Sequence, residues 1–360
     1  MNKTQRGNFF EDFAVGRRFR HATPRTVTDG DVALYTALTG SRFAVNASVT
    51  AAACLGHLRA PLDDLLVFHL VFGKTVPDVS LNAVANLGYA DCVFGAPVYP
   101  GDTLHAESEV IGVRQNSRGD TGTVYVRSTG FNQRGEVVLD YVRWVMVRKA
   151  DPESPAPDPV VPEVSKSVSA DRLLAPDDRT VAAYDTVLSG SDVLWEDYSA
   201  GEKIDHVDGV TVESAEHMAA TRLYHNTARA HFDQYAAQAG RFGHRIVYGG
   251  HIMSLARAVS VNGLANAFRI AAINGGRHVL PVLAGDTVYA WTEVLERIAL
   301  PGRSRVGALR LRAVATRDLP CESFPYRDEG DAEGGKYHPA VVLDLDYTVL
   351  IPRRGDGAAD

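Results

Sequence analysis

The chain contains the same sequence pattern twice. Residues 10–13 (FEDF) recur at 195–198 (WEDY), 185 positions later (195 − 10), and residues 97–104 (PVYPGDTL) recur at 281–288 (PVLAGDTV), 184 positions later (281 − 97). Two separate blocks therefore keep nearly one register. A repeat of this kind confines the chain to folds that are built from two copies of one structural unit.

A third shared block locates an insertion in the second copy. Residues 137–140 (VVLD) recur at 341–344, which is 204 positions later (341 − 137) and thus about 20 more than the offset of the preceding block (204 − 184). We place these extra residues at about 318–337, where the sequence becomes acidic and rich in glycine, as surface loops often are.

A proline-rich segment separates the two copies. Residues 151–162 contain five prolines, which hold a chain extended and deny it regular backbone hydrogen bonding. We therefore expect an N-terminal domain at 1–150, a linker at 151–185 and a C-terminal domain at 186–354.

Both copies show the same order of secondary-structure signals. An amphipathic stretch and then a more apolar stretch predict two helices, and β-branched residues in partial alternation predict the antiparallel strands that follow. We expect helices at 29–38, 65–72, 214–223 and 250–259, and strands at 104–113, 122–131, 137–148, 287–295, 304–315 and 341–351. A long helix beside a run of antiparallel strands is an α+β arrangement.

Charge and cysteine content exclude several classes of protein. The formal net charge is −7, and no run of Lys and Arg provides the basic surface that nucleic-acid binding needs. The three cysteines (Cys54, Cys92 and Cys321) form no CxxC pair, so neither a disulfide framework nor a zinc site is indicated. No stretch has the roughly 20 apolar residues of a membrane helix, and residues 1–8 contain no apolar h-region of the kind found in signal peptides. We expect a cytoplasmic protein with no metal, no cofactor and no membrane partner.

The block at 97–104, together with an apolar helix before it and long strands after it, resembles the MaoC-like dehydratases of the hotdog superfamily. The duplication resembles their double-hotdog members, and residues 60–69, 82–89 and 223–232 extend the resemblance over nearly the whole chain. The resemblance implies that a sheet wraps around a central helix in each copy. It also implies an acyl-CoA substrate, the reversible hydration of mesaconyl-CoA (2-methylfumaryl-CoA) to β-methylmalyl-CoA, and assembly into a homo-oligomer.

The hydratases of this family carry an Asp-x-Asn-Pro-x-His motif, and the matching segment here is 226–231. His231 is present, and an imidazole titrates near neutral pH and can serve as acid or base. Asn226 replaces the aspartate, so it can orient water but cannot take a proton. The first copy has Ser41 and Asn46 at these positions, 185 residues earlier, so we expect a single active site, mainly on the second copy.

The missing carboxylate has several candidate replacements. Asp63, Asp64 and Asp233 could each supply it. Asp63 and Asp64 could equally cap the helix that begins near residue 65, because negative charge is favoured at a helix N-terminus.

Two further groups of residues are candidates for substrate contacts. Tyr248, Gly249 and Gly250 precede the apolar helix of the second copy, where backbone N–H groups could form an oxyanion hole. The free carboxylate of the acyl group needs a cation, for which Arg229 and Arg42 are the main candidates and Arg245 and His244 are secondary ones.

Three other functions stay open at this point. An (R)-specific hydratase for other enoyl-CoA thioesters would have the same chemistry with another acyl pocket, and a thioesterase could use the same fold. Because the motif aspartate is absent, a protein that binds acyl-CoA without turnover is the non-enzymatic alternative.

Overall fold

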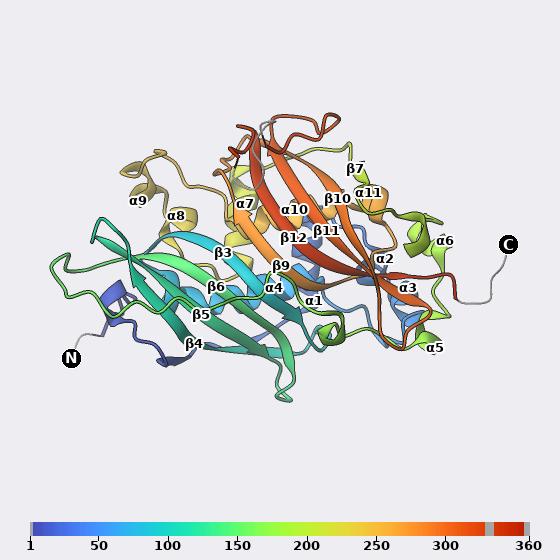
Figure 1. The fold of residues 1–360 in the computed structure, drawn as a ribbon, viewed down its shortest axis with the longest axis horizontal. Coiled ribbons are helices and arrows are strands. Elements are labelled where there is room, and N and C mark those ends of the chain that lie inside the picture. The colour runs from blue at the N-terminus through green and yellow to red at the C-terminus, as the bar shows by residue number, and fades with distance from the viewer. Residues whose placement is uncertain (1–2, 328–334, 356–360) are drawn as a thin grey trace.

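The described residues, 3–327 and 335–355 of a computed structural model, form one continuous antiparallel sheet of 12 strands. The strands follow the order β1-β4-β5-β6-β3-β9-β12-β11-β10-β7, and β2 and β8 pair with β4 and β10 (Figure 1). The strands from β1 to β3 in this order, together with β2, come from the first copy, and the strands from β9 to β7, together with β8, come from the second. The two copies therefore fold into equivalent halves, as the repeat predicts.

The elements of the two halves correspond in order. The first half contains η1 (Phe10–Asp12), β1 (Arg18–Arg20), β2 (Arg25–Thr26), α1 (Asp29–Thr39), α2 (Ala44–Ala47), α3 (Val49–Ala53), α4 (Asp64–Thr75), η2 (Val76–Ser80), β3 (Ala83–Phe94), β4 (Thr103–Gln115), β5 (Thr121–Phe131) and β6 (Val137–Arg148). The second half contains η4 (Trp195–Asp197), β7 (Lys203–Asp205), β8 (Val210–Thr211), α7 (Ser214–Leu223), α8 (Arg229–Phe232), α9 (Gln234–Gln238), α10 (Gly249–Val259), α11 (Val261–Leu264), β9 (Arg269–His278), β10 (Thr287–Ala299), β11 (Val306–Arg317) and β12 (Val341–Pro352).

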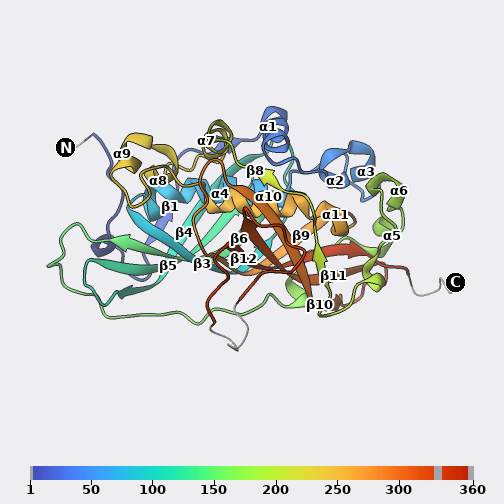
Figure 2. The same ribbon diagram turned by 90° about the horizontal axis from the view of Figure 1, so that it is seen from above.

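The long helices α4 and α10 lie at the centre of the molecule. The sheet covers one side of them and the shorter helices cover the other (Figure 2). In α4 every residue from Leu65 to Thr75 is buried, and in α10 every residue from Gly250 to Val259 is buried. One apolar cluster contains residues of both helices and both half-sheets, so the halves share a single core.

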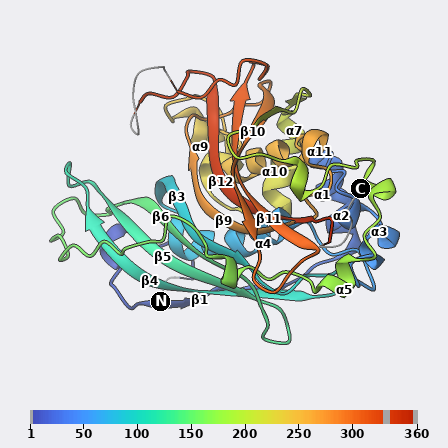
Figure 3. The ribbon, with the colours of Figure 1, turned by 45° about the vertical axis from the view of Figure 1, so that its right-hand side comes forward.

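The strands β3 and β9 join the half-sheets. Tyr89 pairs with Gly276 and Cys92 with Ile273, and the half-sheets meet at an angle along this line (Figure 3). The sequence analysis predicted neither strand. The four predicted helices (α1, α4, α7 and α10) and the other six long strands lie where they were expected, with ends that differ by at most four residues, whereas the short helices were not predicted.

The linker packs against the protein rather than lying free. It contains η3 (Ala170–Arg172) and α5 (Asp178–Val181), and α6 (Thr186–Ser189) follows it. Val168, Leu173 and Val181 are buried in an apolar cluster with residues of both halves. Of the predicted insertion at 318–337, residues 328–334 lie outside the described residues. At its end, Tyr337 donates a hydrogen bond to Asp344 at 2.7 Å.

Candidate functional site

The structure contains two equivalent cavities, one in each half. The His231 cavity, of about 300 Å³, is lined by Asn226, His231, Tyr248 and Gly249 from the second half. The Asn46 cavity, of about 250 Å³, is lined by residues at the corresponding positions of the first half, including Asn46. Each cavity also takes part of its wall from the other half, so neither half encloses a cavity alone.

His231 lies on the short helix α8 and lines its cavity. Its Nδ1 lies 3.0 Å from the carbonyl oxygen of Ile246 and, as the donor to that oxygen, carries the ring proton. Nε2 then has the lone pair and can act as a base. Burial lowers the pKa of His231, so the neutral, basic form is favoured at neutral pH.

Asn226 is buried, with 2% of its surface exposed, in the turn that leads into α8. Its Oδ1 accepts a hydrogen bond from the backbone N–H of Ala228 at 3.1 Å, which fixes the side chain at the cavity wall. The amide nitrogen remains as a donor for a ligand or a water molecule.

Tyr248, Gly249 and Gly250 form the start of α10. Tyr248 is the residue that precedes the helix, and its ring centroid lies 5.7 Å from that of His231. The first N–H groups of a helix have no partner within the helix, and those of Gly249 and Gly250 are such groups. A Cβ atom on Gly249 would lie 2.5 Å from Nδ1 of His278, so only glycine fits beside that ring.

The sequence analysis did not assign a site role to several polar residues of this cavity, of which four matter here: Asn86, Tyr89, Arg143 and His278. The hydroxyl of Tyr89 lies 3.1 Å from Nε2 of His278, and burial lowers the pKa of His278 to about 4. Three of the four lie on β3 and β9, which were not predicted. The first half has Phe94 where the second has His278 (278 − 94 = 184), so an extension of the repeat through these strands could have found that residue.

Neither Asp63 nor Asp64 is among the described residues that line the His231 cavity, which contradicts the expectation that one of them supplies its missing carboxylate. Both stand in the first half at the positions that correspond to Tyr248 and Gly249. Asp63 precedes α4 and accepts a hydrogen bond from the N–H of Leu65 at 2.9 Å, which is the capping role. Asp64 lines the Asn46 cavity.

The cationic candidates lie outside both cavities. Arg229 and Arg42 are exposed, and neither is among the described residues that line the cavities. Their contact with substrate stays a prediction. Arg245 donates a hydrogen bond to Ser214 at 3.1 Å, and His244 is exposed. Asp233 caps α9 through the N–H of Ala236 at 3.0 Å.

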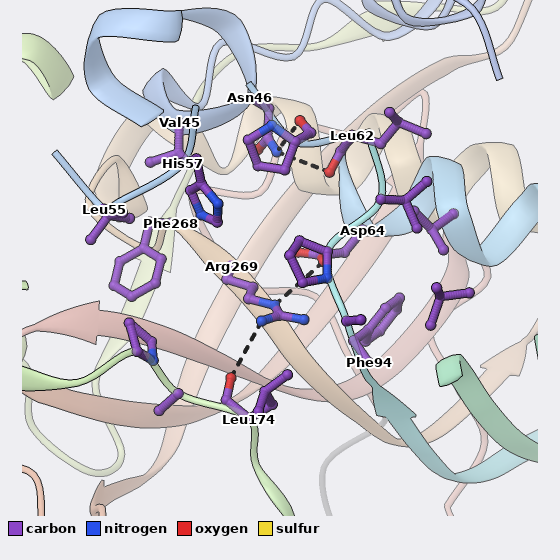
Figure 4. Close-up of a pocket in the computed structure, with 18 residues that line it drawn as sticks. Val45, Asn46, Leu55, His57, Leu62, Asp64, Phe94, Leu174, Phe268 and Arg269 are labelled. Atoms are coloured by element: carbon purple, nitrogen blue, oxygen red, sulfur yellow. Dashed lines mark hydrogen bonds and ion pairs between the residues drawn. The ribbon is translucent and has the colours of Figure 1, made fainter. Parts of the chain in front are cut away.

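An ion pair crosses the Asn46 cavity. Nε of Arg269 lies 3.7 Å from Oδ1 of Asp64, and the same guanidinium donates to the carbonyl oxygen of Leu174 at 3.4 Å (Figure 4). Burial raises the pKa of Asp64 to about 6, while Arg269 opposes this shift. Asn46 donates to the carbonyl oxygens of Pro61 and Leu62, both at 3.2 Å.

The chemical groups of the His231 cavity fit proton transfer and oxyanion binding. It offers an imidazole base, an amide, a phenol and helix N-terminal N–H groups, and no Asp or Glu is among the described residues that line it. In the described part of the chain no group of His, Cys, Asp and Glu side chains could hold a metal ion. Within the same residues, no helix has the length and apolar character needed to cross a membrane.

Known proteins resemble this chain over nearly its whole length. A family profile described as mesaconyl-CoA hydratase matches residues 1–323. The beta-methylmalyl-CoA dehydratase of Chloroflexus aurantiacus is 64% identical over 353 residues, which cover 98% of this chain and 99% of that protein. The mesaconyl-CoA hydratase of Cereibacter sphaeroides is 56% identical, over 98% of this chain and 100% of that protein.

Solved structures share the fold. A crystal structure of a MaoC domain protein dehydratase from Chloroflexus aurantiacus matches with a TM-score of 0.95 and 64% identity, covering 99% of this chain and all of that one. A Mycobacterium tuberculosis protein with a double hotdog fold matches with a TM-score of 0.75 and 25% identity, covering 96% of this chain and 99% of that one. The double hotdog fold that the sequence resemblance implied is therefore confirmed.

Proposed function

Because the chain belongs to the mesaconyl-CoA hydratase family, whose members are hydro-lyases, we propose that it catalyses the reversible hydration of mesaconyl-CoA to β-methylmalyl-CoA. The observation that carries the proposal is the geometry of His231. Its Nδ1 donates to a backbone carbonyl, so its Nε2 carries the lone pair of a base in a cavity that is also lined by Gly249 at the N-terminus of α10.

Water adds to the carbon atom β to the thioester. In this proposal Nε2 of His231 takes a proton from the water molecule while Asn226 orients that molecule through its amide. The oxygen then attacks the β-carbon, and the negative charge moves through the α-carbon to the thioester oxygen.

The enolate that results needs donors and a proton. The N–H groups of Gly249 and Gly250 are the donors that we assign to the thioester oxygen, at the positive end of the α10 dipole. The imidazolium of His231 then gives its proton to the α-carbon, and the reverse sequence removes water from β-methylmalyl-CoA. A single histidine thus serves both steps, which fits a cavity without a lining carboxylate among the described residues.

The test is an assay of the purified protein with mesaconyl-CoA, in which the absorbance of the conjugated thioester and the mass of the product are followed. We expect a gain of one water molecule, and we expect the His231→Ala variant to lose that activity. Release of free thiol would instead identify a thioesterase, and hydration of crotonyl-CoA alone would identify a hydratase for other acyl groups. Binding of mesaconyl-CoA without any turnover would contradict an enzymatic role.

Two properties expected from the sequence, a homo-oligomeric state and a cytoplasmic location, belong to the same proposal. Light scattering coupled to size-exclusion chromatography measures the first, and fractionation of cells that produce the protein tests the second.

A further inference from the structure

Arg143 is a fully buried cation that has only neutral partners. It lies on β6 with 0% of its surface exposed, and its guanidinium stacks over the ring of Phe72, 4.2 Å from the centroid. Its Nη2 donates to the hydroxyl of Thr75 at 2.7 Å, and the hydroxyl of Ser80 lies 3.3 Å from the same atom. No carboxylate of the described residues forms an ion pair with it. A buried charge without a counter-charge is unfavourable, so an anion is expected to meet this group.

The wall around Arg143 contains other polar atoms that lack a partner. Nε of Arg143, both amide atoms of Asn86 and the hydroxyl of Tyr248 are buried and make no hydrogen bond with the part of the chain that the structure describes. All three residues line the His231 cavity. Buried polar groups are nearly always paired in folded proteins, so three such donors around one cavity indicate a ligand with acceptor oxygens.

Arg257, the second arginine that is buried among the described residues, differs from Arg143 in the groups around it. Arg257 stands in α10 where α4 has Phe72 (257 − 72 = 185), and it lies 3.5 Å from the ring centroid of Phe43. Burial lowers the pKa of Arg257, and Tyr347, Asp63 and Asp64 oppose this shift, so acidic groups of the protein partly compensate its charge. Among the described residues, the groups that oppose the effect of burial on Arg143 are tyrosines (Tyr89, Tyr141 and Tyr248) and include no carboxylate. The difference indicates that the charge of Arg143 serves a bound molecule.

We infer that Arg143, with Asn86 and Tyr248, forms the subsite for the free carboxylate of the acyl group and thereby selects dicarboxylic over monocarboxylic acyl-CoA thioesters. The inference rests on the proposed function and deepens it. A planar guanidinium binds carboxylates well, and Tyr248 and Asn86 add donors for the same oxygens.

The position of Arg143 fits the chemistry of the substrate. In mesaconyl-CoA the free carboxylate is bonded to the β-carbon, which is the atom that receives water. Ring contacts lead from His231 to Tyr248 (5.7 Å between centroids), from Tyr248 to Phe72 (5.6 Å) and from Phe72 to the guanidinium of Arg143. These contacts place both groups along one wall of the cavity, and in our inference a carboxylate bound to Arg143 directs the β-carbon toward the water that His231 activates.

The test compares two substrates that differ only in this group. In 2-methylcrotonyl-CoA a methyl group replaces the carboxylate of mesaconyl-CoA. We expect Arg143→Met to lower kcat/KM for mesaconyl-CoA by about 10²- to 10³-fold, since it removes one partner of a buried ion pair, and to lower that for 2-methylcrotonyl-CoA far less. The matched control is Arg118→Met, which changes an exposed arginine in the turn between β4 and β5 and should leave both values unchanged. An unchanged ratio of the two kcat/KM values in Arg143→Met would overturn the inference.

A second measurement covers the case in which Arg143→Met does not fold or the wild-type protein hydrates neither thioester. Calorimetry then compares the binding of succinyl-CoA and butyryl-CoA to the wild-type protein and to Arg143→Lys, which keeps the charge but not the planar fork. We expect the wild type to bind succinyl-CoA at least about 10-fold more tightly, and Arg143→Lys to reduce this preference. Equal affinities in the wild type would overturn the carboxylate subsite, whereas a preference for succinyl-CoA without any hydration would overturn only the proposed reaction.

Discussion

The two cavities have the same origin in the fold and different contents. His231 in one and Asn46 in the other occupy equivalent positions (231 − 46 = 185), and both donate a hydrogen bond to an equivalent backbone carbonyl, that of Ile246 or Pro61 (246 − 61 = 185). An asparagine amide can thus replace the structural hydrogen bond of the histidine. It offers no second ring nitrogen, so it cannot replace the base. The comparison separates what the loop needs to fold from what the reaction needs.

The cavities also differ in what crosses them. Asp64 and Arg269 form an ion pair across the Asn46 cavity, and the corresponding residues of the His231 cavity are Gly249 and Ala85. Small residues leave room for a substrate beside the N-terminus of α10, whereas the ion pair occupies that room in the other half. The Asn46 cavity, of about 250 Å³, remains, but an internal ion pair lies where the His231 cavity, of about 300 Å³, has only small residues.

The largest effect is expected when His231 is replaced by asparagine, the residue at the equivalent position of the first half. We expect His231→Asn to keep the hydrogen bond to Ile246 and therefore the melting temperature, and to lower kcat for hydration by about 10²- to 10⁴-fold, the usual contribution of acid–base catalysis. Steady-state kinetics and thermal unfolding of the same sample measure both.

The pH dependence should follow the same residue. Because burial lowers the pKa of His231, the base form persists below the ordinary imidazole value of about 6.5, and kcat/KM should fall only at lower pH. This acidic limb should be absent from the residual activity of His231→Asn.

In the matched variant Asn46→Ala we expect unchanged kinetics and a loss of stability of about 1 kcal/mol, the usual effect of a lost hydrogen bond. A large loss of activity there would contradict the assignment of a single active site.

A smaller effect is expected when a larger side chain replaces Gly249 at the wall of the His231 cavity. In Gly249→Ala the new Cβ would meet His278 at 2.5 Å, so either that ring or the start of α10 must move. We expect kcat to fall by about 10- to 100-fold, because misplacing one oxyanion donor costs at most what removing it does. The equivalent position in the other half is occupied by Asp64, so Gly249→Asp extends the series and should be inactive. Full activity of Gly249→Ala would exclude its N–H from the oxyanion site.

The smallest effect that we expect is on the stability of the protein, and it comes from Asp64 in the Asn46 cavity. The pKa of Asp64 is raised from 3.8 to about 6 in the folded chain. A carboxyl group with a higher pKa in the folded state binds more protons when folded, so it favours folding below pH 4, and that contribution is lost as the pH rises from 4 to 6.

We therefore expect the free energy of unfolding of the wild type to fall relative to that of Asp64→Asn by about 1–3 kcal/mol between pH 4 and pH 6. Urea denaturation at several pH values measures this difference. A constant difference across that range would show that the carboxyl group titrates normally.

The sequence predicts most of the fold because its strongest signals are local or periodic. The helix bounds around α7 and α10 and the strand β6 follow from side-chain periodicity, and the duplication follows from blocks that keep their register. The motif likewise leads to His231 and Asn226, and both line the cavity.

The missing parts depend on contacts between distant segments. In β9 the run Ile270 to Ile273 is apolar on both faces, so it shows no alternation that distinguishes a strand from a buried helix. Its partner strand β3 lies more than 170 residues earlier in the chain, so local sequence signals cannot reveal the pairing. Arg143 was missed for a related reason. A single arginine in a strand does not indicate a binding site in the sequence, and only the fold shows that it lines the same cavity as Tyr248 and Asn86. The opposite error placed Asp63 and Asp64 at the site, since the sequence does not show which cavity a helix N-terminus faces.

The pairing of β3 with β9 has a consequence for how the chain avoids aggregation while it folds. Each strand is the inner edge of its half-sheet, 12 residues long in one case and 10 in the other, and edges of that length are templates for aggregation when they are unpaired. Two separate half-chains would have to find each other by collision before these edges were covered. Covalent connection in tandem makes the encounter intramolecular, which raises the effective concentration of each half around the other. The duplication therefore protects each half with the other.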